Sequence, residues 1–139
     1  SLDATIQYQY LALLKELQAE TGMSIIFITH DFGIVAKMCD RVAVMYAGRV
    51  AEIADVRDLF NNPAHPYTEA LMRSVPNVDE EVEYLYSIEG QPPALDNLPP
   101  GCTFAPRCPY VFDRCNEAFP DLIQVGDRHS ATCWKLAGK

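Results

Sequence analysis

The chain has 139 residues, enough for one domain or a small domain with an appended segment, which excludes a large multidomain enzyme. Its composition, 49% hydrophobic and 22% charged, is typical of a globular protein and excludes general disorder. Eleven basic against nineteen acidic residues give a formal charge of −8, which argues against nucleic acid as a partner. No apolar run approaches the roughly 18 residues of a bilayer-spanning helix, and the start lacks the pattern of a secretory signal. We expect a soluble, intracellular protein.

The first part of the chain has the pattern of an α/β fold. Apolar residues recur at three- and four-residue spacing from 5 to 19, which predicts a helix with one buried stripe that Asp3 caps and Gly22 ends. Residues 23–29 read MSIIFIT, which predicts a strand buried on both faces of a parallel sheet. Asp31 is then placed to cap a second short helix. Helix, buried strand and helix in succession are typical of an α/β domain.

The next residues predict an antiparallel end to the sheet. Stretches 42–46 and 50–53 flank a Gly-containing connection typical of a β-hairpin. Asp55 is placed to cap a short helix ending near 61–63, and the His-Pro pair at 65–66 opens another. We expect both helices to pack at the periphery, with the histidine as a turn residue.

The composition changes near residue 75. Residues 76–100 hold an acidic run and two proline pairs, which predicts a semi-extended linker. Residues 101–139 hold four of the five cysteines and form a third part, a four-cysteine module, whereas residues 1–75 form the closing part of an α/β domain. An α/β domain normally opens with a strand, and none precedes the first helix here. We therefore expect an excised trailing piece of a longer protein whose opening strands lie upstream.

The four late cysteines are the clearest candidate site. They follow the pattern C-x5-C-x6-C-x17-C, whereas structural zinc sites usually pair cysteines two to four residues apart and ferredoxin runs are tighter still. A short proline-rich segment needs a cross-link to hold a fold, and reducing surroundings disfavour disulfides. A metal centre would meet that need, although the spacing alone leaves metal, cluster, disulfides and free thiols open. The four residues are Cys102, Cys108, Cys115 and Cys133.

Several further residues are candidates for a role. His30 follows the predicted strand at the edge where open α/β sheets bind ligands, although a structural histidine is the commoner outcome for this position alone. The structural role of a helix N-cap explains Asp3 as well as a functional role does. We expect Cys39 to pack as a small core residue and His129, near Cys133, to be a weaker alternative ligand. The arginines between the cysteines would offset thiolate charge or lie in solvent; they are Arg107, Arg114 and Arg128.

Several motifs resemble the nucleotide-binding subunits of ABC transporters. Ser-Leu-Asp at residues 1–3 resembles the D-loop, and Ile-Thr-His-Asp at 28–31 resembles the segment that delivers the switch histidine. Residues 39–49, CDRVAVMYAGR, are similar to the hairpin that follows in that family. A narrower match is to the C-terminal region of the oligopeptide and dipeptide importers, over 62–71 (NPAHPYTEAL), 90–93 (GQPP) and 101–109 (GCTFAPRCP).

The resemblance implies the C-terminal part of an ATP-hydrolysing subunit that uses ATP and Mg²⁺ to energise peptide import. It implies that His30 contacts the γ-phosphate and orients the attacking water, and that Asp3 lies at the interface with a second ATP-binding subunit. The family can carry an iron–sulfur cluster at the four cysteine positions, so a [4Fe-4S] cluster is favoured there, with zinc as the alternative. The implied location is peripheral, on the cytoplasmic face of the membrane, beneath permease subunits that receive the solute from an extracytoplasmic binding protein.

The sequence lacks several motifs of the family pattern. It contains no G-x-x-x-x-G-K-[ST] phosphate loop, no Gly-rich signature loop and no acidic strand end before the D-loop. Phosphoryl transfer then loses its positioning and charge compensation, so we expect this chain alone not to hydrolyse ATP. Two other functions remain open: an independent iron–sulfur electron carrier, and a partner-binding module stabilised by zinc.

Overall fold

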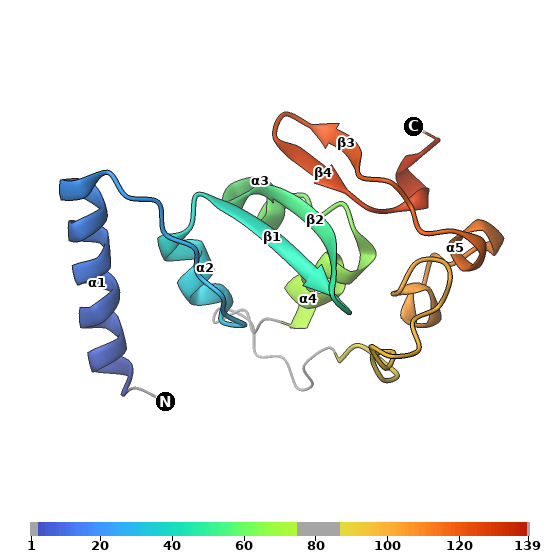
Figure 1. The fold of residues 1–139 in the computed structure, drawn as a ribbon, viewed down its shortest axis with the longest axis horizontal. Coiled ribbons are helices and arrows are strands. Elements are labelled where there is room, and N and C mark those ends of the chain that lie inside the picture. The colour runs from blue at the N-terminus through green and yellow to red at the C-terminus, as the bar shows by residue number, and fades with distance from the viewer. Residues whose placement is uncertain (1–2, 75–86, 139) are drawn as a thin grey trace. The chain divides into compact units, whose positions relative to one another are not determined.

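The computed structural model describes residues 3–74 and 87–138, and the first part of the predicted linker, 76–86, which holds its acidic run, lies outside them. The chain divides into two compact units, residues 1–40 and 41–139 (Figure 1). This division differs from a boundary near residue 75, because the late segment adds strands to the early hairpin, as described below. The three-part organisation of the sequence remains a prediction. No helix among the described residues is long and apolar enough to cross a bilayer.

The first unit contains two helices with the predicted caps. Helix α1 spans Ala4–Thr21; the Asp3 carboxylate accepts a hydrogen bond from the Thr5 amide at 2.9 Å, and Gly22 ends the helix at φ 69°. Helix α2 spans Phe32–Met38, and Asp31 accepts from the amides of its first turn at 2.8 and 3.1 Å. Both capping predictions are confirmed.

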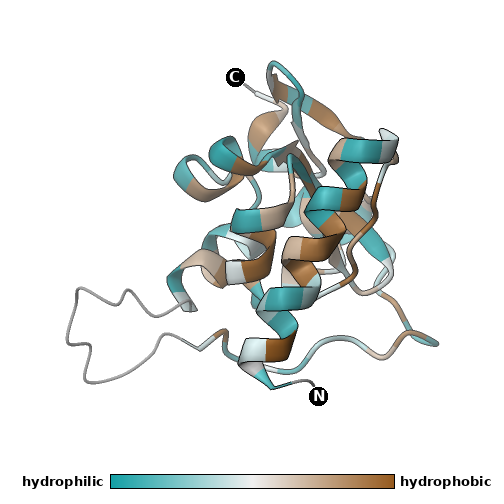
Figure 2. Cartoon of the chain, turned by 90° about the vertical axis from the view of Figure 1, so that its left-hand side faces the viewer, coloured by the Kyte–Doolittle hydropathy of each residue, from teal (hydrophilic) through white to brown (hydrophobic). Residues whose placement is uncertain are grey.

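The predicted strand at residues 23–29 is wrong for this structure. The segment has no strand pairing, and the side chains of Ile26 and Ile28 are 89% and 99% exposed. The reason is physical: a strand exists only by exchanging hydrogen bonds with a neighbour, and every strand that the structure describes belongs to the second unit. The expected buried stripe of α1 is likewise exposed, with Ile6 and Leu13 each at 50%. Figure 2 shows apolar and polar segments alternating along this helix.

The second unit is built on one antiparallel sheet in the order β1-β2-β4-β3. Strands β1 (Arg41–Tyr46) and β2 (Arg49–Asp55) form the predicted hairpin, whose turn residues Ala47 and Gly48 both have positive φ, as a tight two-residue turn requires. Strands β3 (Ile123–Gly126) and β4 (His129–Ala131) form a second hairpin. Strand β4 pairs with β2, a contact that sequence patterns did not predict.

Short helices complete the second unit. The predicted helices are confirmed as α3 (Val56–Asn61) and α4 (Pro66–Ser74), but the Asp55 side chain makes no capping hydrogen bond to α3. Val44, Ala54 and Leu59 form a buried cluster to which side chains of β1 and α4 add partly buried surface. Helix α5 (Asp113–Glu117) and the 3-10 turns η1 (Ala105–Arg107) and η2 (Trp134–Leu136) carry the late cysteines or adjoin them.

Candidate functional site

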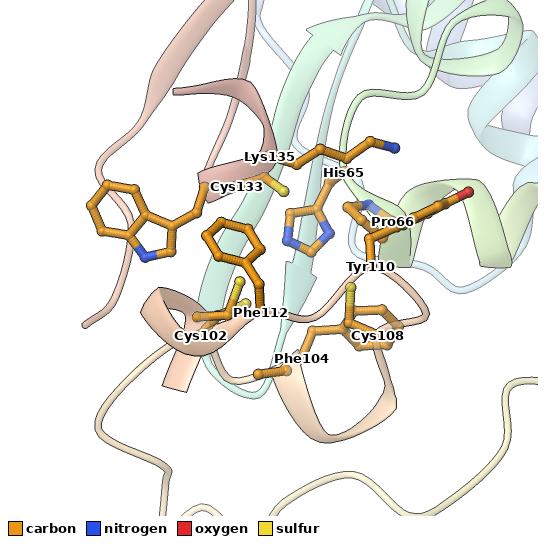
Figure 3. Close-up of a pocket in the computed structure, with 12 residues that line it drawn as sticks. His65, Pro66, Cys102, Phe104, Cys108, Tyr110, Phe112, Cys133 and Lys135 are labelled. Atoms are coloured by element: carbon orange, nitrogen blue, oxygen red, sulfur yellow. The ribbon is translucent and has the colours of Figure 1, made fainter. Parts of the chain in front are cut away.

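The four late cysteines line one pocket, and Figure 3 labels three of them, Cys102, Cys108 and Cys133. Cys102 lies before η1, Cys108 ends it, Cys115 lies within α5, and Cys133 comes just before η2. Cys115 and Cys133 are buried, while the other two are half-buried. Three separate stretches of chain therefore supply thiols to the same space, as the sequence analysis expected of a single site.

A close backbone approach holds two of these stretches together. The Cys102 amide donates to the carbonyl of Cys115 at 2.8 Å. A Cβ atom placed on Gly101 would lie 2.1 Å from that same carbonyl oxygen, so only glycine fits this position. The Gly-Cys pair at 101–102 is thus dictated by the approach of the loop to α5.

The pocket disfavours free thiolates. Burial is the largest cause that raises the pKa of the Cys102, Cys108 and Cys133 thiols, and that of Cys133 rises to about 11. Backbone hydrogen bonds to the sulfurs lower these pKa values in part, and charge repulsion from the neighbouring cysteines raises them further. Thiolates would form here only around a cationic centre, because such a centre repays the cost of burying them.

The donor atoms of the pocket are those that a single metal ion or an iron–sulfur cluster would use. Among residues 3–74 and 87–138, no set of three or more His, Cys, Asp or Glu side chains is arranged to hold one metal ion. A tetrahedral zinc ion would need all four sulfurs about 2.3 Å from a single point. An all-cysteine set around a shared pocket is nevertheless the donor chemistry of an iron–sulfur cluster.

His65 lies at a bend directly before α4, in line with the expected turn, and also forms part of the pocket wall. The residue is only 3% exposed, and its Nδ1 accepts a hydrogen bond from the Tyr67 amide at 3.0 Å. Burial is the main cause that lowers the imidazole pKa from 6.5 to about 4, against smaller opposing contributions from Glu52 and from a backbone hydrogen bond with Thr132. The imidazole is therefore neutral near pH 7.

Glu52 lies beneath His65 and is fully buried at the centre of β2. Its Oε2 accepts from the His65 amide at 2.9 Å, and its Oε1 accepts from the Ala64 amide at 2.8 Å. The same Oε1 lies 2.6 Å from Nε2 of His129 on β4. His129 thus pairs with Glu52 and is absent from the pocket lining, which corrects its expected role as an alternative ligand.

Aromatic rings connect the pocket to the rest of the second unit. Phe104, 1% exposed, packs against Tyr46 of β1 and Tyr67 of α4 with ring centroids 5.3 and 5.4 Å apart. Tyr46 and Tyr67 contact each other at 4.6 Å. The loop that carries the first two cysteines is thereby fixed onto the hairpin and α4.

Comparison with known proteins shows which proteins this chain resembles. Residues 51–115, from within β2 through Cys115, match the family described as "Oligopeptide/dipeptide transporter, C-terminal region". Residues 51–115 are thus similar to the C-terminal region of these transporters. It is also 49% identical over 134 residues to the dipeptide transport ATP-binding protein DppD of Bacillus subtilis, and 48% identical to the oligopeptide transport ATP-binding protein AppD of the same organism.

The similarity covers nearly all of this chain but only part of each relative. The DppD and AppD matches cover 96% of this chain, and 40% and 41% of those proteins. The oligopeptide transport ATP-binding protein OppD of Mycobacterium tuberculosis is 48% identical over 134 residues, which are 22% of its length. The chain thus spans about two fifths of the length of the first curated relatives it matches.

The three arginines between the cysteines are absent from the pocket lining, and Arg114 and Arg128 are exposed, as expected of surface arginines. The Arg107 guanidinium donates to the carbonyls of Ile88 and Glu89 at 2.7 and 2.8 Å. Arg114 stacks on Trp134 at 3.7 Å, and Arg128 pairs with Asp55 at 3.2 Å. The cation that lines the pocket is Lys135, which lies 3.7 Å from the Tyr110 ring and whose charge lowers the pKa of the Cys108 thiol against the larger effect of burial.

The predicted nucleotide-related residues lie in the first unit. Asp3 caps α1, and His30 is exposed just before α2. Their roles at a nucleotide or at a subunit interface remain predictions. Cys39, expected within a helix, instead follows the end of α2 and is half-buried; burial and then the charge of Asp40 raise its pKa.

Two residues of the site escaped the sequence analysis in different ways. The His-Pro-Tyr sequence at 65–67 is part of the resemblance, but the sequence indicates only a turn for its histidine. Glu52 carried a signal that was not used: a single acidic residue inside the apolar strand VAEIA. An acidic residue in such a place indicates a buried carboxylate with dedicated donors.

Proposed function

We propose that the chain is part of an ATP-hydrolysing subunit that energises ABC-type import of oligopeptides or dipeptides. The observation that carries the proposal is the similarity, 45–49% over 96% of the chain, to proteins named as peptide transport ATP-binding proteins. In such a subunit the partners would be a second ATP-binding subunit and membrane permeases supplied by an extracytoplasmic binding protein. The subunit would lie on the cytoplasmic face of the membrane.

His30 is the residue of this chain that would act on ATP. It follows a segment without strand pairing, and the adjacent Asp31 is already engaged as the cap of α2, so the exposed imidazole is available to a ligand. Its contribution would be to contact the γ-phosphate and position the attacking water, while bound Mg²⁺ would supply charge compensation to the phosphates. Asp3, at the start of α1, would contact the second ATP-binding subunit.

The test is His30→Ala in the full-length subunit, with ATP turnover and nucleotide binding measured separately. Turnover should fall by roughly 10²-fold, the cost typical of losing one positioned contact in a transition state, while nucleotide affinity should stay within about 3-fold. Gln9→Ala on the exposed face of α1 is the control and should change neither quantity. Unchanged turnover in His30→Ala would show a structural histidine.

A second measurement uses residues 1–139 on their own, without the rest of the subunit. Because its sequence contains no phosphate loop, titration calorimetry of residues 1–139 with Mg·ATP should give no binding in the micromolar range. Micromolar affinity would contradict the proposal that the phosphates are held by residues outside this sequence.

For the cysteine pocket we propose a [4Fe-4S] cluster bound by Cys102, Cys108, Cys115 and Cys133. Two observations support it: the four thiols line one pocket, and burial raises the pKa of three of them. When bound, the cluster would supply a covalent cross-link among three chain segments. Zinc would meet the same two observations and is the alternative.

Iron and acid-labile sulfide analysis tests the cluster. Chain purified without oxygen should be brown and hold about four iron and four sulfide per molecule. Cys115→Ser should lose most of this content, whereas Cys39→Ser, the matched control outside the pocket, should keep it. Colourless protein with one zinc would refute the cluster. Reversible cycling of the cluster at an accessible potential, with the fold retained in both states, would favour an electron carrier.

A further inference from the structure

We infer that His65 is a positioning residue of the cysteine pocket, one that holds the chain leading into Cys133 and the loop between Cys102 and Cys108. The His-Pro-Tyr sequence that carries it has so far been accounted for only as the start of α4. The inference rests on the proposed function in so far as the pocket binds a cluster, but the arrangement of the four thiols can be measured with or without one.

The imidazole is fixed from its own side of the chain. Glu52, which is fully buried, accepts hydrogen bonds from the amides of Ala64 and His65 at 2.8 and 2.9 Å, so the backbone under the ring cannot shift freely. The Tyr67 amide donates to Nδ1 at 3.0 Å and sets the ring orientation. Because Nδ1 is an acceptor, the proton of the neutral ring lies on Nε2.

The other side of the ring faces the cysteine-bearing segments. The imidazole is hydrogen-bonded to the backbone of Thr132, the residue immediately before Cys133. The Thr132 amide already donates to the Ala51 carbonyl at 2.8 Å, so the group that Nε2 meets is the Thr132 carbonyl. The ring also packs on Phe104, which lies between Cys102 and Cys108, at a centroid distance of 6.0 Å. Figure 3 shows His65 among the labelled cysteines.

Helix capping alone does not account for a histidine here. The hydrogen bond from the Tyr67 amide is the bond that an N-cap side chain accepts, and Asn, Ser, Thr or Asp would supply it with shorter side chains. The side chains of those residues are too short to contact the Thr132 backbone as Nε2 of His65 does. His65→Asn therefore separates the two roles: it keeps the cap and removes the link to the pocket.

The experiment measures how fast each cysteine of the full chain is alkylated by iodoacetamide, by mass spectrometry, in cluster-free protein at one pH. In His65→Asn, alkylation of Cys133 should rise about 10-fold relative to Cys39, which lies in the other unit and serves as the internal reference. The thermal unfolding midpoint should stay close to the wild-type value, because the cap is kept. His65→Gln, whose longer amide keeps a donor toward Thr132, should recover most of the protection.

Thr68→Val is the matched control. It lies on the same helix, is fully buried and has a hydroxyl without a hydrogen-bond partner, so it changes a nearby side chain without touching the pocket. It should leave the alkylation of Cys133 unchanged. If it accelerates alkylation as much as His65→Asn does, the effect is general loosening and the inference is wrong.

Measurements on iron-loaded chain separate this inference from the proposed cluster. In His65→Asn the visible absorbance of the cluster should decay in air about 10-fold faster than in wild type, and the electron paramagnetic resonance signal of the one-electron reduced cluster should broaden. Wild-type chain without iron would refute the cluster alone, and the alkylation rates would still decide the role of His65. Wild-type rates of both alkylation and cluster decay in His65→Asn would overturn the inference, as would failure of His65→Gln to restore protection.

Discussion

The two units use similar apolar residues with opposite results. In residues 1–40 the aliphatic side chains of Ile26 and Ile28 are almost fully exposed, whereas in residues 41–139 Ala54 and Leu59 are fully buried. The difference lies in pairing. Strand β2 has a hydrogen-bonded neighbour on each side, β1 and β4, while residues 23–29 have none that the structure describes. Strand-forming composition is therefore not sufficient, because the backbone must also find partners.

The second unit also differs in having a charge at its centre. Glu52 links β2 to β4 through His129, and to the start of α4 through the amides of residues 64 and 65. Burying a carboxylate is costly unless donors surround it, so this residue specifies which segments meet. In the first unit the helix caps are exposed, and a bond from the Lys15 ammonium to the Lys37 carbonyl joins its two helices.

The largest expected effect is that of Glu52→Ala. Removing the carboxylate leaves two amides and the His129 ring without their partner, which should lower the free energy of unfolding by about 3–5 kcal/mol. Urea denaturation followed by the fluorescence of Trp134, the single tryptophan, reports on this unit. The control is Glu69→Ala, which breaks a surface pair with Arg73 at 2.6 Å and should cost less than about 1 kcal/mol. Equal losses in both variants would show that Glu52 is an ordinary surface charge.

Next in size is the contrast between two aliphatic truncations. Leu59→Ala should cost about 2–5 kcal/mol, because the side chain is fully buried in the core cluster and its loss leaves a cavity. Ile28→Ala, at a side chain 99% exposed, should cost less than about 0.5 kcal/mol. Trp134 fluorescence reports the first variant, and the urea dependence of far-ultraviolet circular dichroism covers both units. A loss of several kcal/mol in Ile28→Ala would mean that this side chain is buried in solution and that the two units are more alike than the structure shows.

Local signals were predicted well because their causes are local. Asp3, Asp31 and Gly22 act within one helical turn, so the caps could be derived from neighbouring residues alone. The hairpin of β1 and β2 required only the turn at 47–48. The pairing of β2 with β4 joins residues far apart in sequence, and nothing in the three residues of β4 indicates which strand they meet.

The candidate site divides in the same way. The four cysteines could be grouped from their abundance in one segment, and the structure places them around one pocket. His65 and Glu52 could not be connected to that pocket from sequence, because their roles depend on the pairing of β2 with β4. His129 illustrates the resulting error: its nearness to Cys133 in sequence indicated a ligand, whereas strand pairing turns it toward Glu52.

The smallest effect is a pH dependence that should distinguish the buried site from the rest of the chain. The pKa of His65 is about 4 in the folded protein and near 6.5 when unfolded. Below pH 6.5 the unfolded chain therefore binds a proton that the native imidazole does not, so the free energy of unfolding should decrease as the pH falls toward 4. The full difference corresponds to roughly 3 kcal/mol, and about 1 kcal/mol of it is expected at pH 5.5.

Glu52, Tyr67 and the pocket thiols also lie near this ring, so the quantity to measure is the difference between wild type and His65→Asn, which retains them. Urea curves at pH 7, 6 and 5 should show that difference shifting in favour of the variant as the pH falls, and curves that stay parallel would mean that the imidazole is solvated in the folded chain.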